Sequence, residues 1–144
     1  MAALTITASQ VVPDTSGKRR TGVAGAAIAV GKAVYYSATA NTWNLADADA
    51  LATVKEGEDA GIAISASSAA NQYVTVQTTG SPTIGAGAAP AAGTIYVVGL
   101  TAGDIVPDTD LGAGDFPCIL GPGSGTNQIT LGATGTILGQ TAHA

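Results

Sequence analysis

Short apolar runs separated by glycine-rich or polar connections dominate the hydrophobic pattern of this chain. In residues 61–65 and 73–77, apolar residues alternate with polar or very small ones at every second position. A period of two is typical of a β-strand that places one face on a core and the other in solvent or at a contact. The pattern therefore predicts two strands here, joined by residues 65–72.

The rest of the chain repeats this pattern with shorter runs. Glycines and prolines mark the expected turns, and residues 13–25 and 85–93 are interpreted as a polar loop or extended arm and a low-complexity loop. Only residues 46–52 have fair helix propensity, for about two turns. Further strands are expected at 4–7, 26–29, 33–37, 41–45, 94–99, 116–120, 128–131 and 136–139.

Many short strands with close turns and almost no helix indicate an all-β fold, a small antiparallel barrel or sandwich with an extended N-terminal arm. The length of 144 residues suits one domain with its own core. We expect residues 1–23 to form an N-terminal strand and arm, 24–139 the β domain and 140–144 a tail. The residues expected to be mainly buried are Ile28, Val34, Leu45, Ile62, Ile64, Val74, Val76, Ile95, Val97, Ile119 and Ile129.

The composition indicates a weakly charged surface made of small side chains. Only 10% of residues are charged, against about 25% in an average domain, and the net charge is −5. An acidic chain has no broad attraction for nucleic acid or anionic lipid. No apolar run approaches the roughly 20 residues that span a bilayer, and no signal peptide is evident. We therefore expect a soluble protein made in a cytoplasm, without nucleic-acid or membrane partners.

The basic residues are concentrated in one place. Lys18, Arg19 and Arg20 are three of the five basic residues in the chain. Such a run is commonly a solvated surface, but in an acidic chain it also suits docking on an acidic partner. These three residues are the candidate partner-binding site.

Other chemistry-bearing residues suggest no catalytic, cofactor or metal site. His143 is the only histidine and lies at the chain end, and the single cysteine, Cys118, lies in an apolar run and is expected to be buried. The aspartates of segment 104–115 carry carboxylate oxygens, which are ligands that calcium accepts. Their spacing, however, fits no EF-hand loop. We favour turn formation by solvated aspartates as the explanation of that segment, and cation binding there stays open.

Short motifs of glycine and small apolar residues follow one another in a defined order from Ala24 to Leu131. They are Gly31-Lys-Ala-Val-Tyr-Tyr36, Trp43-Asn-Leu-Ala-Asp-Ala-Asp49, Ala60-Gly-Ile-Ala-Ile64, Tyr73-Val-Thr-Val-Gln-Thr78, Ala92-Gly-Thr-Ile-Tyr-Val-Val98, Ala102-Gly-Asp-Ile105, Asp108-Thr-Asp-Leu111 and Ile119-Leu-Gly121. The order of these motifs resembles that of phage capsid decoration, or cement, proteins.

The resemblance implies a non-enzymatic, β-rich virion protein on the outer capsid surface. It would bind the major capsid protein after the head expands and stabilise contacts between subunits, as a homotrimer or as three copies grouped on the shell. The alternative is a fibre or adhesin module that recognises host-surface glycans. Few aromatic residues, 4% of the chain, count against that alternative.

Overall fold

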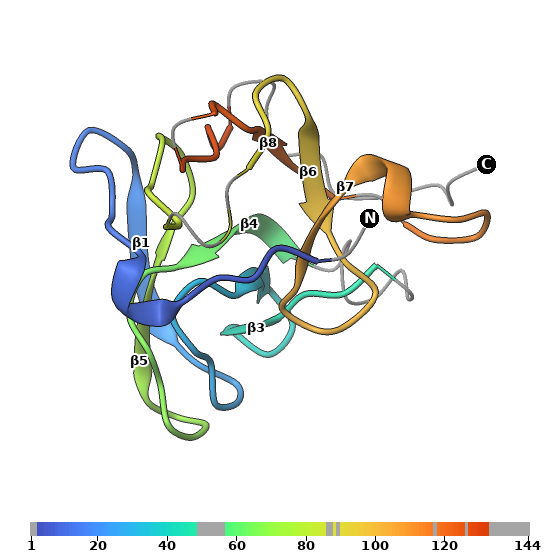
Figure 1. Cartoon of the computed structure of the whole chain (residues 1–144). Coiled ribbons are helices and arrows are strands. Elements are labelled where there is room, and N and C mark those ends of the chain that lie inside the picture. Colours follow the sequence, from blue (N-terminus) through green and yellow to red (C-terminus); the bar gives the residue numbers. More distant parts are fainter. Residues whose placement is uncertain are drawn as a thin grey trace.

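Within residues 3–48, 57–85, 88, 90–116, 118–125 and 127–132, which the computed structural model describes, the chain forms eight strands in two antiparallel sheets (Figure 1). One sheet has the order β1-β5-β4-β2-β3 and the other the order β7-β6-β8. The strands are β1 (Arg19–Val23), β2 (Ala33–Ser37), β3 (Thr42–Leu45), β4 (Gly57–Ala63), β5 (Tyr73–Gln77), β6 (Ile95–Val98), β7 (Ile105–Pro107) and β8 (Ile119–Pro122).

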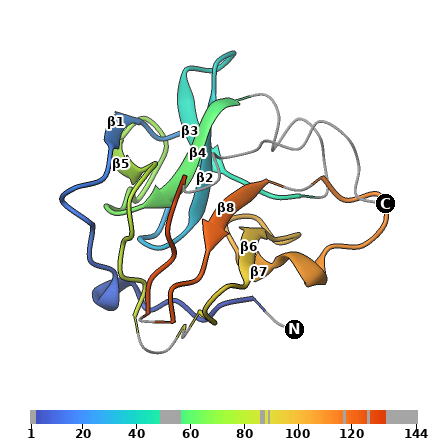
Figure 2. The same cartoon turned by 90° about the horizontal axis from the view of Figure 1, so that it is seen from above.

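The expected all-β class is confirmed. The helical segments in the described residues are two 3-10 turns, η1 (Ala8–Gln10) and η2 (Asp108–Asp110). The two sheets lie beside one another as in a small sandwich (Figure 2).

The five-stranded sheet curls until its two end strands meet. Ala24, directly after β1, forms a bridge with Trp43 of β3, and the Gly25 N–H donates to the Trp43 carbonyl at 2.8 Å. A Cβ at Gly22 would lie 2.9 Å from Trp43 Nε1, so glycine lets β1 pass close to the indole. The curl encloses one apolar cluster, formed by Ala24, Ile28, Val34, Trp43, Ala63, Val74 and Val76.

A larger core fills the space between the two sheets. Successive side chains of a strand point to opposite faces, and β2 shows this directly. Val34 points into the curl, whereas Ala33 and Tyr35 belong to the core between the sheets. Because both faces of β2 are covered, nearly every side chain on it is buried. Tyr96 and Leu120 supply the opposite wall of this core from β6 and β8.

Most of the residues expected in the core are buried there, and four are not. Seven are buried: Ile28, Val34, Ile62, Val74, Val76, Val97 and Ile129. The expectation is wrong for Leu45, Ile64, Ile95 and Ile119, which are only partly buried. Ile64 lies one residue beyond β4, and Ile95 and Ile119 pack at the margin of a small third cluster on the three-stranded sheet.

Several predicted elements are also wrong. Residues 4–7 form no strand, and residues 26–29 contribute only the isolated bridge between Ile28 and Ser67. The segment 13–25, expected to be a loop or arm, contains β1, and the turn-rich segment after Gly103 contains β7. The strand expected at 136–139 lies outside the described residues.

The helix expected at 46–52 is absent from residues 46–48, the part of this segment that the structure describes. The Ala46 N–H donates to the Ala33 carbonyl at 3.1 Å, and the Ala48 N–H donates to the Gly99 carbonyl at 2.9 Å. These bonds tie the segment to both sheets, and residues 46–48 have no helical structure. Residues 49–52 lie outside the described part.

The N-terminal segment lies against the domain along part of its length. Leu4 and Ile6 pack on the core between the sheets, and the Leu4 N–H donates to the Ile105 carbonyl at 2.8 Å. Val12 forms a bridge with Thr83. Backbone bonds and apolar contacts thus place residues 4–12 on the fold.

Candidate functional site

The three candidate cations lie at one end of the five-stranded sheet. Arg19 and Arg20 are the first residues of β1, and Lys18 directly precedes them. All three are exposed, and β1 is the end strand of its sheet. Arg19 and Arg20 therefore stand on a hydrogen-bonded strand, which gives them a more fixed geometry than a loop would.

The strand register places Arg19 and Arg20 on opposite faces of the sheet. Arg20 is opposite Val76 and Arg19 is opposite Gln77, and adjacent residues of a strand point to opposite faces. Val76 belongs to the cluster inside the curl, so Arg20 is on the inner face at its rim. Arg19 is on the outer face.

Arg20 packs on two aromatic rings. Its guanidinium carbon is 4.9 Å from the centroid of the Tyr36 ring and 5.5 Å from that of the Trp43 ring. The two rings are a cross-strand pair in edge-to-face contact, with centroids 5.3 Å apart and an interplanar angle of 66°. These distances are in the range of cation–π attraction. Arg20 therefore helps to close the curl as well as carrying charge.

A buried glutamine fixes the chain that leads into β1. Gln77 is fully buried, although its strand pattern groups it with exposed Tyr73. Its Oε1 accepts the Asp14 N–H at 3.0 Å, and its Nε2 donates to the carbonyls of Asp14 and Thr79 at 2.9 and 2.8 Å. The Lys18 N–H donates to Thr79 Oγ1 at 2.8 Å. Nothing in the alternation of β5 signals this burial.

The Asp14 carboxylate completes this turn. It accepts the Ser81 N–H on Oδ2 at 2.8 Å, and Oδ1 accepts both the N–H and the hydroxyl of Ser16. The bonds from Ser81 and then from Ser16 lower the pKa of Asp14 below its ordinary value of 3.8. A carboxyl with a lowered folded-state pKa stabilises the fold above its unfolded pKa, and this stability is lost as the pH falls through the folded pKa.

We predict that Asp14→Asn lowers the thermal midpoint at neutral pH, because an amide nitrogen in the Oδ2 position cannot accept the Ser81 N–H. The gap between the two proteins should shrink as the pH falls from about 5 towards about 2, where the native carboxylate becomes protonated. Thermal unfolding followed across that pH range checks this. A gap that stays constant with pH would show that the carboxylate charge makes no contribution.

The aspartates of segment 104–115 take part in turns and in one ion pair. Asp104 Oδ1 is 3.3 Å from Lys32 Nζ, and Asp115 Oδ2 accepts the Gly112 N–H at 2.6 Å. Asp108 and Asp110 begin and end η2. In the part of the chain that the structure describes, no three acidic, cysteine or histidine side chains gather closely enough to hold a metal ion.

The thiol of Cys118 is not placed as a reactive group. Cys118 is buried as expected, and burial raises the pKa of its thiol to about 12. A thiol with so high a pKa carries almost no nucleophilic thiolate at neutral pH. His143 lies outside the described residues.

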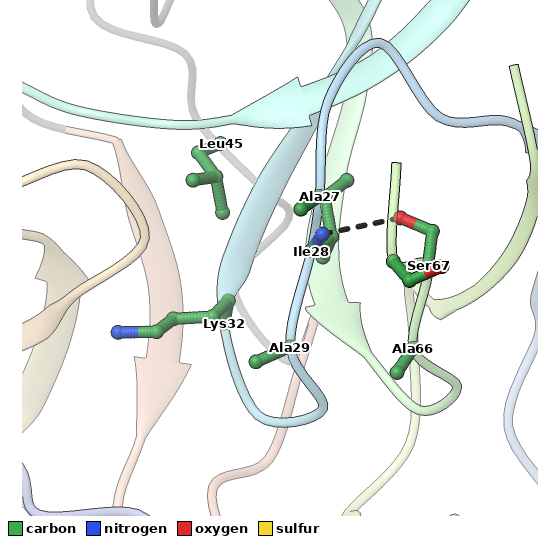
Figure 3. Close-up of a pocket in the computed structure, with 8 residues that line it drawn as sticks. Ala27, Ile28, Ala29, Lys32, Leu45, Ala66 and Ser67 are labelled. Atoms are coloured by element: carbon green, nitrogen blue, oxygen red, sulfur yellow. Dashed lines mark hydrogen bonds between the residues drawn. The ribbon is translucent and has the colours of Figure 1, made fainter. Parts of the chain in front are cut away.

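An open hollow of about 440 Å³ lies between the loop that contains Ala27 and Ala29 and the side chain of Leu45 (Figure 3). Its wall is fixed by Ser67, whose hydroxyl accepts the Ile28 N–H at 3.1 Å and donates to the Ala26 carbonyl at 3.0 Å. The only cation in its lining, Lys32, is paired with Asp104. A ligand site usually directs several polar groups at one point, and this lining does not.

Comparison with known proteins identified no relative. No family model, curated protein or solved structure matches this chain. In the described residues, no helix has the length and apolar character needed to cross a membrane. The geometry of β1 and its surroundings is therefore the basis for the functional argument.

Proposed function

We propose that this chain is a capsid decoration protein that binds the outer surface of an expanded phage head. The observation that carries the proposal is the position of Arg19 and Arg20 at the start of an ordered end strand, with Lys18 directly before them, in a chain whose net charge is −5. Such a strand presents a local positive charge in a defined orientation. The motif order that resembles decoration proteins supports the same conclusion.

The proposed role requires binding and no chemistry. The partner is the major capsid protein, and an acidic region of its outer surface would meet the exposed cations of β1. Contact with more than one capsid subunit would stabilise the junction between them. We further propose a threefold grouping of copies on the shell, because a closed ring leaves no unpaired contact surface. Copies that meet only on the head would gain from the high local concentration that the first contacts create.

The glycan-binding alternative requires exposed aromatic rings, and the fold buries three of the six aromatic residues and leaves one strongly exposed. Trp43 and Tyr96 are 1% and 2% exposed. Tyr35 is also buried, and Tyr73 is the one aromatic residue among the strongly exposed large side chains of the described residues. A flat sugar-stacking platform is therefore not formed by these rings, which favours the decoration role.

Co-sedimentation with heads of the parent phage tests the proposal. We expect the purified chain to sediment with expanded heads and to stay in the supernatant with unexpanded heads, because the binding surface forms across subunits after expansion. A glycan array with the same preparation should show no reproducible sugar class. Equal binding to both head forms, or to neither, would contradict the proposal, and selective binding to one glycan class would favour the alternative.

A further inference from the structure

The strands β1 and β5 share an outer face that is distinct from the inner face occupied by Arg20. In their antiparallel register, Thr21 is opposite Thr75 and Val23 is opposite Tyr73. Directly opposed residues point to the same side of a sheet, so these four side chains lie on the face that also carries Arg19. The other side of the same strands carries Val74 and Val76, which are fully buried in the curl, and the sheet therefore supports this face from behind.

Tyr73 is the most exposed large apolar side chain in the described residues. It is 74% exposed, although it begins a strand in which Val74, Val76 and Gln77 are all fully buried. Tyrosine presents a large contact area at a low cost in conformational entropy, and it is enriched among the residues that dominate binding energy.

Cross-strand contacts hold the surface beside Tyr73 in place. The hydroxyls of Thr21 and Thr75 are hydrogen-bonded to each other at 2.9 Å across the two strands. Val23 is half-buried beside Tyr73 and adds a small apolar area. The face thus combines the Tyr73 ring, the hydroxyls of Thr21 and Thr75 and, at its other end, the cation of Arg19.

The charge of this face indicates the chemistry of its partner. Arg19 lies at one end of it, whereas the aspartates of segment 104–115 belong to β7, η2 and the adjoining turns, at the far side of the molecule in Figure 1. Two copies of the face would bring like charges together, which disfavours symmetric self-association. An acidic surface on a different protein complements it.

We propose that the outer face of β1 and β5 docks on an acidic surface of the capsid protein, with Tyr73 inserted as an apolar anchor and Arg19 as the adjacent charge contact. This inference rests on the proposed function and adds a residue, Tyr73, that the basic run does not include. It also separates the roles of the arginines, because Arg20 is held on the rings of Tyr36 and Trp43 on the opposite face.

Binding isotherms on expanded heads test the inference, with Tyr73→Ala as the variant and Leu100→Ala as the control. Leu100 is 45% exposed and lies after β6, which is a strand of the other sheet. We expect Tyr73→Ala to weaken binding by at least about tenfold, as for a dominant interface residue, with an unchanged thermal midpoint. Leu100→Ala should stay within about twofold of the unmodified protein, as for a residue outside the contact.

The other outcomes separate this inference from the proposed function. If the unmodified protein binds expanded heads and Tyr73→Ala binds equally well, the inference is wrong and the decoration role stands. If the unmodified protein binds no heads, both are overturned. If Tyr73→Ala instead dissociates an oligomer of the free protein in light scattering, the face joins copies of this chain, and the inference is overturned in favour of self-association.

Discussion

Replacing Trp43 with Ala is expected to lower the free energy of unfolding by about 3–5 kcal/mol, the usual cost of truncating a large buried aromatic side chain. The indole is 1% exposed and fills the curl of the five-stranded sheet. Its loss also removes the edge-to-face contact with Tyr36 and the packing of Arg20. The cavity would lie where β1 meets β3, so the closure of the sheet should weaken as well.

Urea denaturation of Trp43→Ala, followed by circular dichroism, measures this effect. Leu100→Ala is the matched control, because an exposed side chain in a different sheet should change stability by less than about 0.5 kcal/mol. A loss below about 1 kcal/mol for Trp43→Ala would mean that the indole does not fill the curl as described.

Replacing Lys18, Arg19 and Arg20 together with Ser is expected to weaken binding to expanded heads by at least about tenfold at low salt. Each surface ion pair contributes only about 0–1 kcal/mol, but the contacts of Lys18 and Arg19 can together exceed the 1.4 kcal/mol that corresponds to a tenfold change. Screening is substantial at 0.1 M salt, where the Debye length is about 10 Å. The affinity of the unmodified protein should therefore fall with salt, whereas the affinity of the triple variant should change little.

Two controls separate charge from structure in this experiment. A double variant with Ser at positions 18 and 19 keeps Arg20 on its aromatic rings, so it should retain the thermal midpoint while losing most of the binding. Lys32→Ser removes a cation that is paired with Asp104 outside β1, and it should leave head binding unchanged. Unchanged affinity together with an unchanged salt slope in the triple variant would remove β1 from the interface.

The sequence predicts those strands whose side chains alternate against a core. β5 was predicted from this signal, because Val74 and Val76 alternate with polar neighbours and are buried as expected. β1 was not, because Arg-Arg-Thr-Gly-Val has no apolar period and its strand structure depends on pairing with residues 73–77, more than fifty positions away. Such pairing is a property of the tertiary fold, which local propensity does not reveal.

The candidate site was only partly predictable for the same reason. The run of Lys18, Arg19 and Arg20 is visible as a concentration of charge, but only the register shows that the two arginines face opposite sides. Alternation in β5 places Tyr73 on the face opposite Val74 and Val76, whereas Tyr96 lies in a continuous apolar run and is buried. The burial of Gln77 depends on a loop contributed by residues around Asp14, which alternation within β5 cannot indicate.

A cryo-electron-microscopy reconstruction of expanded heads saturated with this protein tests the decoration role most directly. We expect added density on the outer shell at the junctions between capsid subunits, grouped in threes, with the outer face of β1 and β5 turned towards the shell. Isolated copies at hexamer centres would contradict the threefold grouping. A saturated preparation with no added density on the shell would contradict the decoration role itself.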